Sequence, residues 1–176
     1  QMSLFGSVTV DGTDSGSRLG IDTTAVHSSQ DYGNFKIYFV RDELESKNGF
    51  FKLVAANPDD STITLTSSVF KDVYNNEAWN LSVRVKPENY PLDTFVEPSG
   101  GVQQQKYDVI FSGYNAKTTD LFDSFSVSTQ VATSTGKKYI ESAKRVYIGA
   151  DRVNVTGDIS FRSDVLGSSV AYWTKY

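Results

Sequence analysis

The chain of 176 residues contains no cysteine and only one histidine, His27, and these scarcities remove several kinds of chemistry. Without cysteine there is no disulfide, no thiolate metal ligand and no thiol nucleophile. A single histidine cannot build a multi-histidine metal site, and no Gly-x-Ser-x-Gly turn supplies a serine nucleophile beside it. We therefore expect His27 to lie at the end of a strand, without a catalytic role.

Basic residues are also in short supply. The 17 Lys and Arg residues are outnumbered by 21 Asp and Glu residues, which gives a formal net charge of −4. Affinity for a phosphate backbone comes from clustered basic side chains, so nucleic acid is not an expected partner. The sequence also lacks the apolar run of about 20 residues that a spanning helix needs, and we expect no membrane insertion.

Apolar and polar residues alternate through much of the chain, most regularly over residues 124–131 and also over 35–40 and 81–85. Successive side chains of a strand point to opposite faces of its sheet, so this pattern predicts strands with one buried face. Trp79, just before one of these runs, is expected in the core. The other expected strands are residues 7–10, 19–26, 50–55, 63–65, 107–111, 145–148, 153–155, 158–162 and 169–173.

Helical patterns are few. One short helix is expected over residues 135–144 and a single helical turn over 69–75, whereas three prolines make 87–106 the longest expected loop. About a dozen short strands between turns predict an all-β, two-sheet antiparallel jelly-roll sandwich. No linker or repeat divides the chain, so residues 1–176 are expected to form one domain. Strand-like sequence at both ends predicts a segment of a larger polypeptide whose first and last strands are neighbours.

Two parts of the chain carry a family resemblance. The run from Arg145 to Ala150 ends a strand in an Ile-Gly pair, and the segment from Val155 to Ile159 opens the next strand with a glycine. Together with a closing strand that ends at Trp173, they resemble the C-terminal half of laminin G-like domains. Residues 78–85 are similar to the strand of that fold that begins with Trp. The resemblance implies the laminin G-like and concanavalin A-like jelly roll.

Residues 143–152, 40–43 and 85–91 resemble, more closely, laminin G-like domains of large virion structural proteins from marine bacteriophages. This resemblance implies a non-catalytic module that serves capsid or tail decoration, assembly contacts or adhesion to the host surface. Its partners would be other virion proteins or a host-surface glycan. It would lie at the surface of the virion, or otherwise be extracellular.

Carboxylates that could act in polysaccharide cleavage would lie on the strands. Polysaccharide-cleaving enzymes of the fold that this chain resembles carry a Glu-x-Asp-x-x-Glu pattern, which is absent here. Glu43 and Glu45 would share a face if their strand continued, but a charged strand end and turn is the favoured interpretation. Asp120 and Asp123 have the spacing of a loop. We therefore expect no enzyme and no catalytic residue, and a divergent glycoside hydrolase is the weakest alternative.

Calcium is the cofactor that the resemblance implies, because related domains hold one ion at the rim of the sandwich. A calcium-dependent, lectin-like carbohydrate-binding domain is therefore the main alternative function. None of the acidic loop residues has EF-hand spacing, and each is more readily explained as a turn residue, so the metal site stays open. The candidate calcium ligands are Asp31, Asp59, Asp60, Asp93, Asp151 and Asn154. The aromatic residues that could stack on sugars if exposed are Tyr32, Tyr74, Tyr90, Tyr114, Trp79 and Trp173.

Overall fold

The computed structural model describes residues 1–9, 34–56, 62–74, 77–88, 106–117, 120–132, 135–136, 139–140, 144–152, 159–167 and 169–173. Most of these residues are in strands, and none of the others forms a helix that can be delimited. The strands are β1 (Met2–Thr9), β2 (Phe35–Arg41), β3 (Gly49–Ala56), β4 (Thr62–Thr66), β5 (Trp79–Pro87), β6 (Lys106–Lys117), β7 (Asp120–Ala132), β8 (Lys144–Ile148), β9 (Ala150–Arg152) and β10 (Ile159–Arg162).

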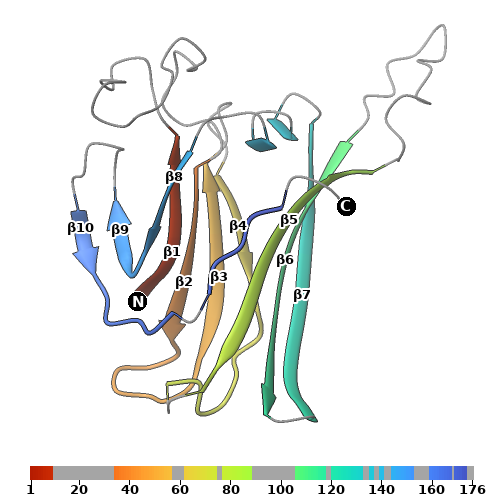
Figure 1. Ribbon diagram of the computed structural model, residues 1–176. Coiled ribbons are helices and arrows are strands. Elements are labelled where there is room, and N and C mark those ends of the chain that lie inside the picture. The colour runs from red at the N-terminus through yellow and green to blue at the C-terminus, as the bar shows by residue number, and fades with distance from the viewer. Residues whose placement is uncertain are drawn as a thin grey trace, which may run out of the picture.

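The strands form two facing antiparallel sheets and a separate hairpin (Figure 1). The larger sheet has the order β4-β3-β2-β1-β8, the smaller has the order β5-β6-β7, and β9 pairs with β10. Most strands that follow one another in the sequence pair as hairpins, and the chain changes sheet between β4 and β5, between β7 and β8 and between β8 and β9. The fold is therefore all-β, antiparallel and β-sandwich-like, as the alternation predicted.

The core fills the space between the two sheets. Buried Phe51 and Leu53 of β3 and Val109 and Phe111 of β6 belong to one apolar cluster, because the inner positions of both strands are apolar. Trp79 packs on this cluster as expected, with its ring centre 4.8 Å from that of Phe51. Aromatic side chains of the two sheets thus pack against each other where Phe51 meets Trp79.

The smaller sheet covers only part of the larger one. Side chains of β5 and β6 face β2 and β3, and β7 contacts β4, so β1 and β8 extend beyond the smaller sheet. The register places Ile148 beside Phe5 and Val146 beside Ser7, on the face that Ile37 turns to the core. Nevertheless, Ile148 is 50% exposed and Val146 is 46% exposed. Part of the apolar inner face of the larger sheet is therefore open.

The expected helices are not confirmed. Among the described residues, pairs 135–136 and 139–140 have helical backbone, but no helix can be delimited, and Lys144 already belongs to β8. Residues 69–74 are not a helical turn either. Phe70 forms an isolated antiparallel bridge with Gly49, and a bend and turn follow at 71–74, with Asp72 at a φ of 55°. Residues 70–74 therefore form a β-bridge and a turn instead of the expected helical turn.

One expected strand is wrong. Residues 169–173 alternate in sequence, yet they form no strand, because no neighbouring backbone pairs with them in the structure. The expected strands at 19–26 and 153–155, and nearly all of the expected loop at 87–106, lie outside the described residues. Within the part of the chain that is described, no helix is long and apolar enough to cross a membrane.

Candidate binding surface

The outer face of the smaller sheet is a regular, solvent-facing surface, which we call the β5–β7 face. It is defined by four rows of residues that pair across the three strands. Three strands and four rows correspond to a surface of about 10 by 20 Å. The rows are Asn80-Tyr114-Ser124, Ser82-Ser112-Ser126, Arg84-Ile110-Ser128 and Lys86-Asp108-Gln130.

One end of the β5–β7 face is aromatic. Tyr114 is 48% exposed in the first row, between Asn80 and Ser124. Phe122 is 57% exposed and lies two residues before Ser124 on β7, next to a register shift between Asn115 and Ala116. The register shift falls at Phe122, since Asp123 pairs with Asn115 and Leu121 pairs with Ala116. One exposed ring thus adjoins an amide and a hydroxyl, and a second exposed ring follows on β7 at the register shift.

The middle and the far end are polar. The hydroxyl oxygens of Ser82 and Ser112 are 2.8 Å apart. In the last row, Gln130 donates through Nε2 to Asp108 Oδ1 at 3.1 Å, and Lys86 Nζ lies 3.6 Å from the other oxygen of this carboxylate. At this end the charge of Lys86 is paired with that of Asp108. The aromatic end instead presents aromatic rings and uncharged hydrogen-bond donors and acceptors.

Such a surface suits a ligand with many hydroxyl groups. Serine hydroxyls and asparagine amides both donate and accept hydrogen bonds, and an exposed ring offers a flat apolar contact for the C–H face of a sugar. The chemistry of the β5–β7 face is therefore that of recognition.

The acidic residues considered for catalysis do not form a pair on a strand. Strand β2 ends at Arg41, and Glu43 and Glu45 lie exposed in the turn that follows, the second with a φ of 64°. They share no strand face, so the favoured interpretation as a charged turn is confirmed. Asp120 and Asp123 belong to β7 and not to a loop. Their spacing is that of a strand interrupted by the register shift.

Asp151 differs from its expected role as a loop ligand. It lies in β9, is 8% exposed, and faces the outer side of the larger sheet. One carboxylate oxygen is 2.5 Å from Nζ of Lys36, and the other accepts a hydrogen bond from the hydroxyl of Tyr38 at 3.0 Å. Burial, and then the hydrogen bond and charge of Asp151, raise the pKa of Tyr38 above its ordinary value. This carboxylate fastens the β9–β10 hairpin to β2.

The remaining calcium candidates, Asp31, Asp59, Asp60, Asp93 and Asn154, lie outside the described residues, as does His27. Across the residues with described positions, no three His, Cys, Asp or Glu side chains are grouped as a metal site. Asp151 already neutralises a lysine, so its oxygens are engaged in an ion pair and a hydrogen bond.

The other aromatic candidates for sugar stacking differ in their exposure and contacts. Tyr74 is partly exposed, but its ring lies 3.7 Å from the guanidinium carbon of Arg41 and stacks near Phe39. Trp173 is 79% exposed on the segment after β10. Tyr32 and Tyr90 are outside the described residues. Sequence reasoning missed Phe122, although its position two residues before the regular alternation of 124–131 was a usable signal.

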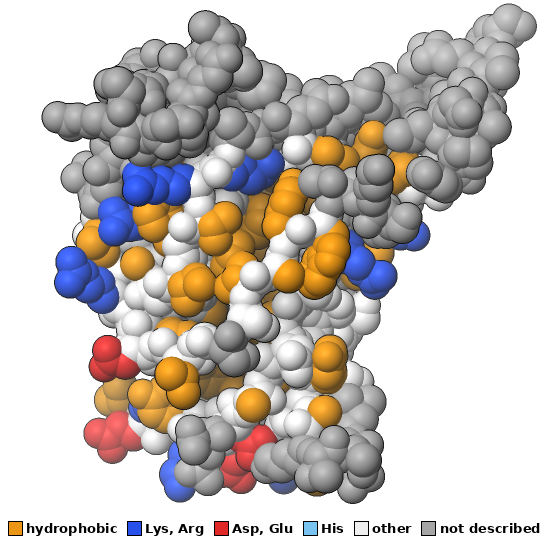
Figure 2. All heavy atoms as spheres, in the orientation of Figure 1, with side chains coloured by type: hydrophobic (Ala, Val, Ile, Leu, Met, Phe, Trp, Pro, Cys, Tyr) orange, Lys and Arg blue, Asp and Glu red, His pale blue; other side chains and the backbone are white. Residues whose placement is uncertain are grey.

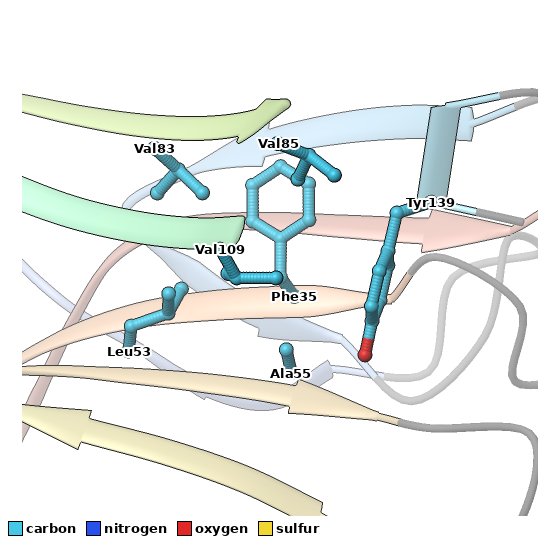
Figure 3. A pocket seen from close by; sticks show the side chains of 7 residues that line it. All are labelled: Phe35, Leu53, Ala55, Val83, Val85, Val109 and Tyr139. Carbon is cyan, nitrogen blue, oxygen red and sulfur yellow. The ribbon is translucent and has the colours of Figure 1, made fainter. Parts of the chain in front are cut away.

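A small apolar cavity lies between the sheets (Figure 3). Its volume is about 10 Å³, which is far below the hundreds of cubic ångströms that an organic ligand needs. Its lining is apolar, so it is a packing gap and not a ligand site. The residues that line it are Phe35, Leu53, Ala55, Val83, Val85, Val109 and Tyr139.

Comparison with known proteins adds no relative: no family model, no curated protein and no solved structure matches this chain. The class that the fold defines is thus a β-sandwich-like, antiparallel two-sheet protein with one exposed polar face. These comparisons give no support to the laminin G-like resemblance, which stays an expectation from the sequence.

Proposed function

We propose that this chain is a non-catalytic binding and structural module of a bacteriophage virion protein, exposed on the particle and used for attachment to a host-surface glycan. The observation that carries the binding role is the aromatic end of the β5–β7 face, where exposed Tyr114 lies between Asn80 and Ser124. Rings beside hydrogen-bonding side chains favour a sugar over a purely apolar or a strongly charged partner.

The proposal also includes the viral setting and the jelly-roll subclass. They are supported by the sequence similarity at residues 143–152, 40–43 and 85–91, and by the two facing antiparallel sheets. Capsid or tail decoration and assembly contacts with other virion proteins are roles of the same kind. They would use exposed sheet faces as well.

A glycan array probed with the purified chain tests the proposal. We expect a reproducible set of bound glycans, and we expect Tyr114→Ala to weaken that binding roughly tenfold, because ring contacts in recognition contribute about 1–2 kcal/mol. Leu44→Ala is the control, since Leu44 is an exposed apolar residue in the turn between β2 and β3 and belongs to none of the rows of the β5–β7 face. Absence of glycan binding, or equal loss in both variants, would contradict attachment through this face.

Repeating the array in the presence of a chelator separates the lectin-like alternative. Binding through the β5–β7 face as described needs no ion, so chelation should leave it unchanged. Binding that disappears with the chelator and returns with calcium would instead favour the calcium-dependent lectin.

A further inference from the structure

The outer edge of β7 is long and regular. β7 is the last strand of the smaller sheet, and Figure 1 shows it in turquoise at the border of that sheet. We call residues 124–131 the β7 edge run; they pair with β6 without a register shift. Among the described residues, this run makes no backbone hydrogen bond on the side away from β6. A row of backbone donors and acceptors is therefore available along about 27 Å of strand.

The other edge strands of the two sheets carry features that oppose pairing, namely charge or short length. β5 carries Arg84 and Lys86, β8 begins with two basic residues, and β4 has only five residues. In Figure 2 many of the charged side chains lie at the left, on the side of β8, β9 and β10. The β7 edge run, by contrast, contains no charged residue, no proline and no glycine. It is therefore the edge best suited to accept another strand.

The β7 edge run is complementary to a second copy of itself. A twofold axis normal to the sheet pairs the two strands antiparallel and keeps both outer faces on one side. With the axis at Val127, Ser126 stands opposite Ser128 of the second copy on the outer side. Phe125 stands opposite Thr129 on the inner side. Polar side chains thus meet polar ones on the outer side, and no like charges face each other.

The contact is large enough for a specific dimer. Seven paired residues extend over about 24 Å, and two packed sheets with their side chains are about 20 Å thick. β4 contacts β7 at the same border, so both sheets contribute to the contact. The contact would bury on the order of 1,000 Å² in total, which is about the lower limit for a specific interface.

We propose that two copies of this chain pair through their β7 edge runs, antiparallel about Val127, and so form one continuous six-stranded sheet. Because each copy uses the same edge, the assembly closes at two chains. The pairing is independent of the proposed function, since it uses backbone hydrogen bonds and needs no ligand. For the proposed function, the dimer would present the aromatic ends of both β5–β7 faces on one surface, which raises avidity for a repetitive glycan.

Sedimentation equilibrium of the full chain tests the pairing, and we expect a monomer–dimer equilibrium over a concentration series. Ser126→Lys/Ser128→Lys places like charges directly opposite each other across the axis and should weaken the dimer about tenfold or more. Ser82→Lys is the matched control, because with Arg84 it puts two basic side chains in the same two rows at the β5 border. Circular dichroism checks that both variants keep the native sheets.

A chain that stays monomeric at every concentration would overturn the proposal. So would a dimer that Ser126→Lys/Ser128→Lys leaves intact, or one that Ser82→Lys weakens equally. Tyr114→Ala should leave the dimer unchanged, because Tyr114 belongs to β6 and not to the paired edge. Loss of glycan binding and loss of pairing are therefore distinguishable.

Disulfide trapping tests the register, and the chain contributes no cysteine of its own. Ser126→Cys and Ser128→Cys are prepared as separate variants and oxidised mildly, each alone and as a mixture. We expect disulfide dimers mainly in the mixture, because each position faces the other across the axis and lies only diagonal to its own copy. Ser82→Cys, at the β5 border, should form none with either variant. A mixture that yields no more dimer than the separate variants would overturn pairing about Val127.

Discussion

Asp151 is the residue whose environment differs most from that of an exposed acid. Its carboxylate binds Lys36 and Tyr38 of β2 while belonging to β9, so one side chain connects the hairpin to the larger sheet. Ser3 strengthens the same junction, because its hydroxyl donates to the carbonyl of Ala150 at 2.9 Å and its amide donates to Ser163 Oγ at 2.8 Å. The hairpin is therefore held by polar contacts with a buried charge at their centre.

We expect Asp151→Asn to lower the free energy of unfolding by about 2–3 kcal/mol, because it leaves the ammonium of Lys36 without its buried counter-charge. Urea denaturation measures the change. Asp108→Asn is the matched control: its pair with Lys86 is 3.6 Å long and more exposed, and such pairs contribute about 0–1 kcal/mol. Equal losses in the two variants would show that Asp151 contributes no more to the free energy of unfolding than the more exposed Asp108.

At the scale of the strand, Gly113 shows how an element can depend on a residue that ordinarily weakens it. It lies inside β6, where a Cβ would be 2.5 Å from the ring of Phe125 and 2.7 Å from Leu81. Phe125 cannot withdraw easily, since it packs on Phe51 and Phe111. The glycine makes room for a ring that joins the two sheets.

Gly113→Ala should therefore destabilise the chain by about 1–3 kcal/mol through overpacking, although a glycine in a strand is usually the less stable residue. Gly6→Ala in β1 is the control, because the nearest atom to its Cβ would be 3.8 Å away. There we expect no loss, or a gain of about 0.5–1 kcal/mol. Thermal and urea unfolding of both variants measure the difference; destabilisation by Gly6→Ala and not by Gly113→Ala would contradict the packing argument.

The strands could be predicted where one face of the sheet is buried and the other is exposed, because apolar and polar residues then alternate along the strand. Residues 124–131 and 81–85 are examples, and they lie within β7 and β5. The pairing of strands could not be predicted, since it joins residues far apart in the chain. Thus Asp151, which comes shortly after Gly149, was expected in a loop but lies in a strand of three residues. Residues 169–173 alternate as well, yet alternation alone supplies no partner.

The candidate site was predictable to a similar degree. Tyr114 was among the possible sugar-stacking residues, but its neighbours Asn80 and Ser124 come from strands that only the register brings together. Glu43 and Glu45 depended on whether β2 continued, and it ends at Arg41. Local sequence therefore indicated which side chains were exposed but not which of them share a surface.

At the scale of the whole molecule, two buried tyrosines and one half-buried lysine should control stability in alkaline solution. Burial lowers the pKa of Lys144 from 10.5 to about 8 and raises the pKa of Tyr139 from 10.0 to about 12. Burial, with Asp151 adding to it, also raises the pKa of Tyr38. The lysine and the tyrosines act in opposite directions, because a neutral amine has lost its proton whereas a neutral phenol has kept it.

Between about pH 8 and 10 the unfolded chain holds a proton on Lys144 that the folded chain has released, so the free energy of unfolding should rise with pH. Above pH 10 the unfolded chain loses tyrosine protons that the folded chain keeps at Tyr38 and Tyr139, so the free energy should fall. Urea midpoints measured from pH 7 to 11 should therefore pass through a maximum near pH 10. Lys144→Met should remove the rise, and Tyr38→Phe/Tyr139→Phe should reduce the fall. A steady decline from pH 8 that neither variant alters would show that these three groups do not govern the alkaline stability of the fold.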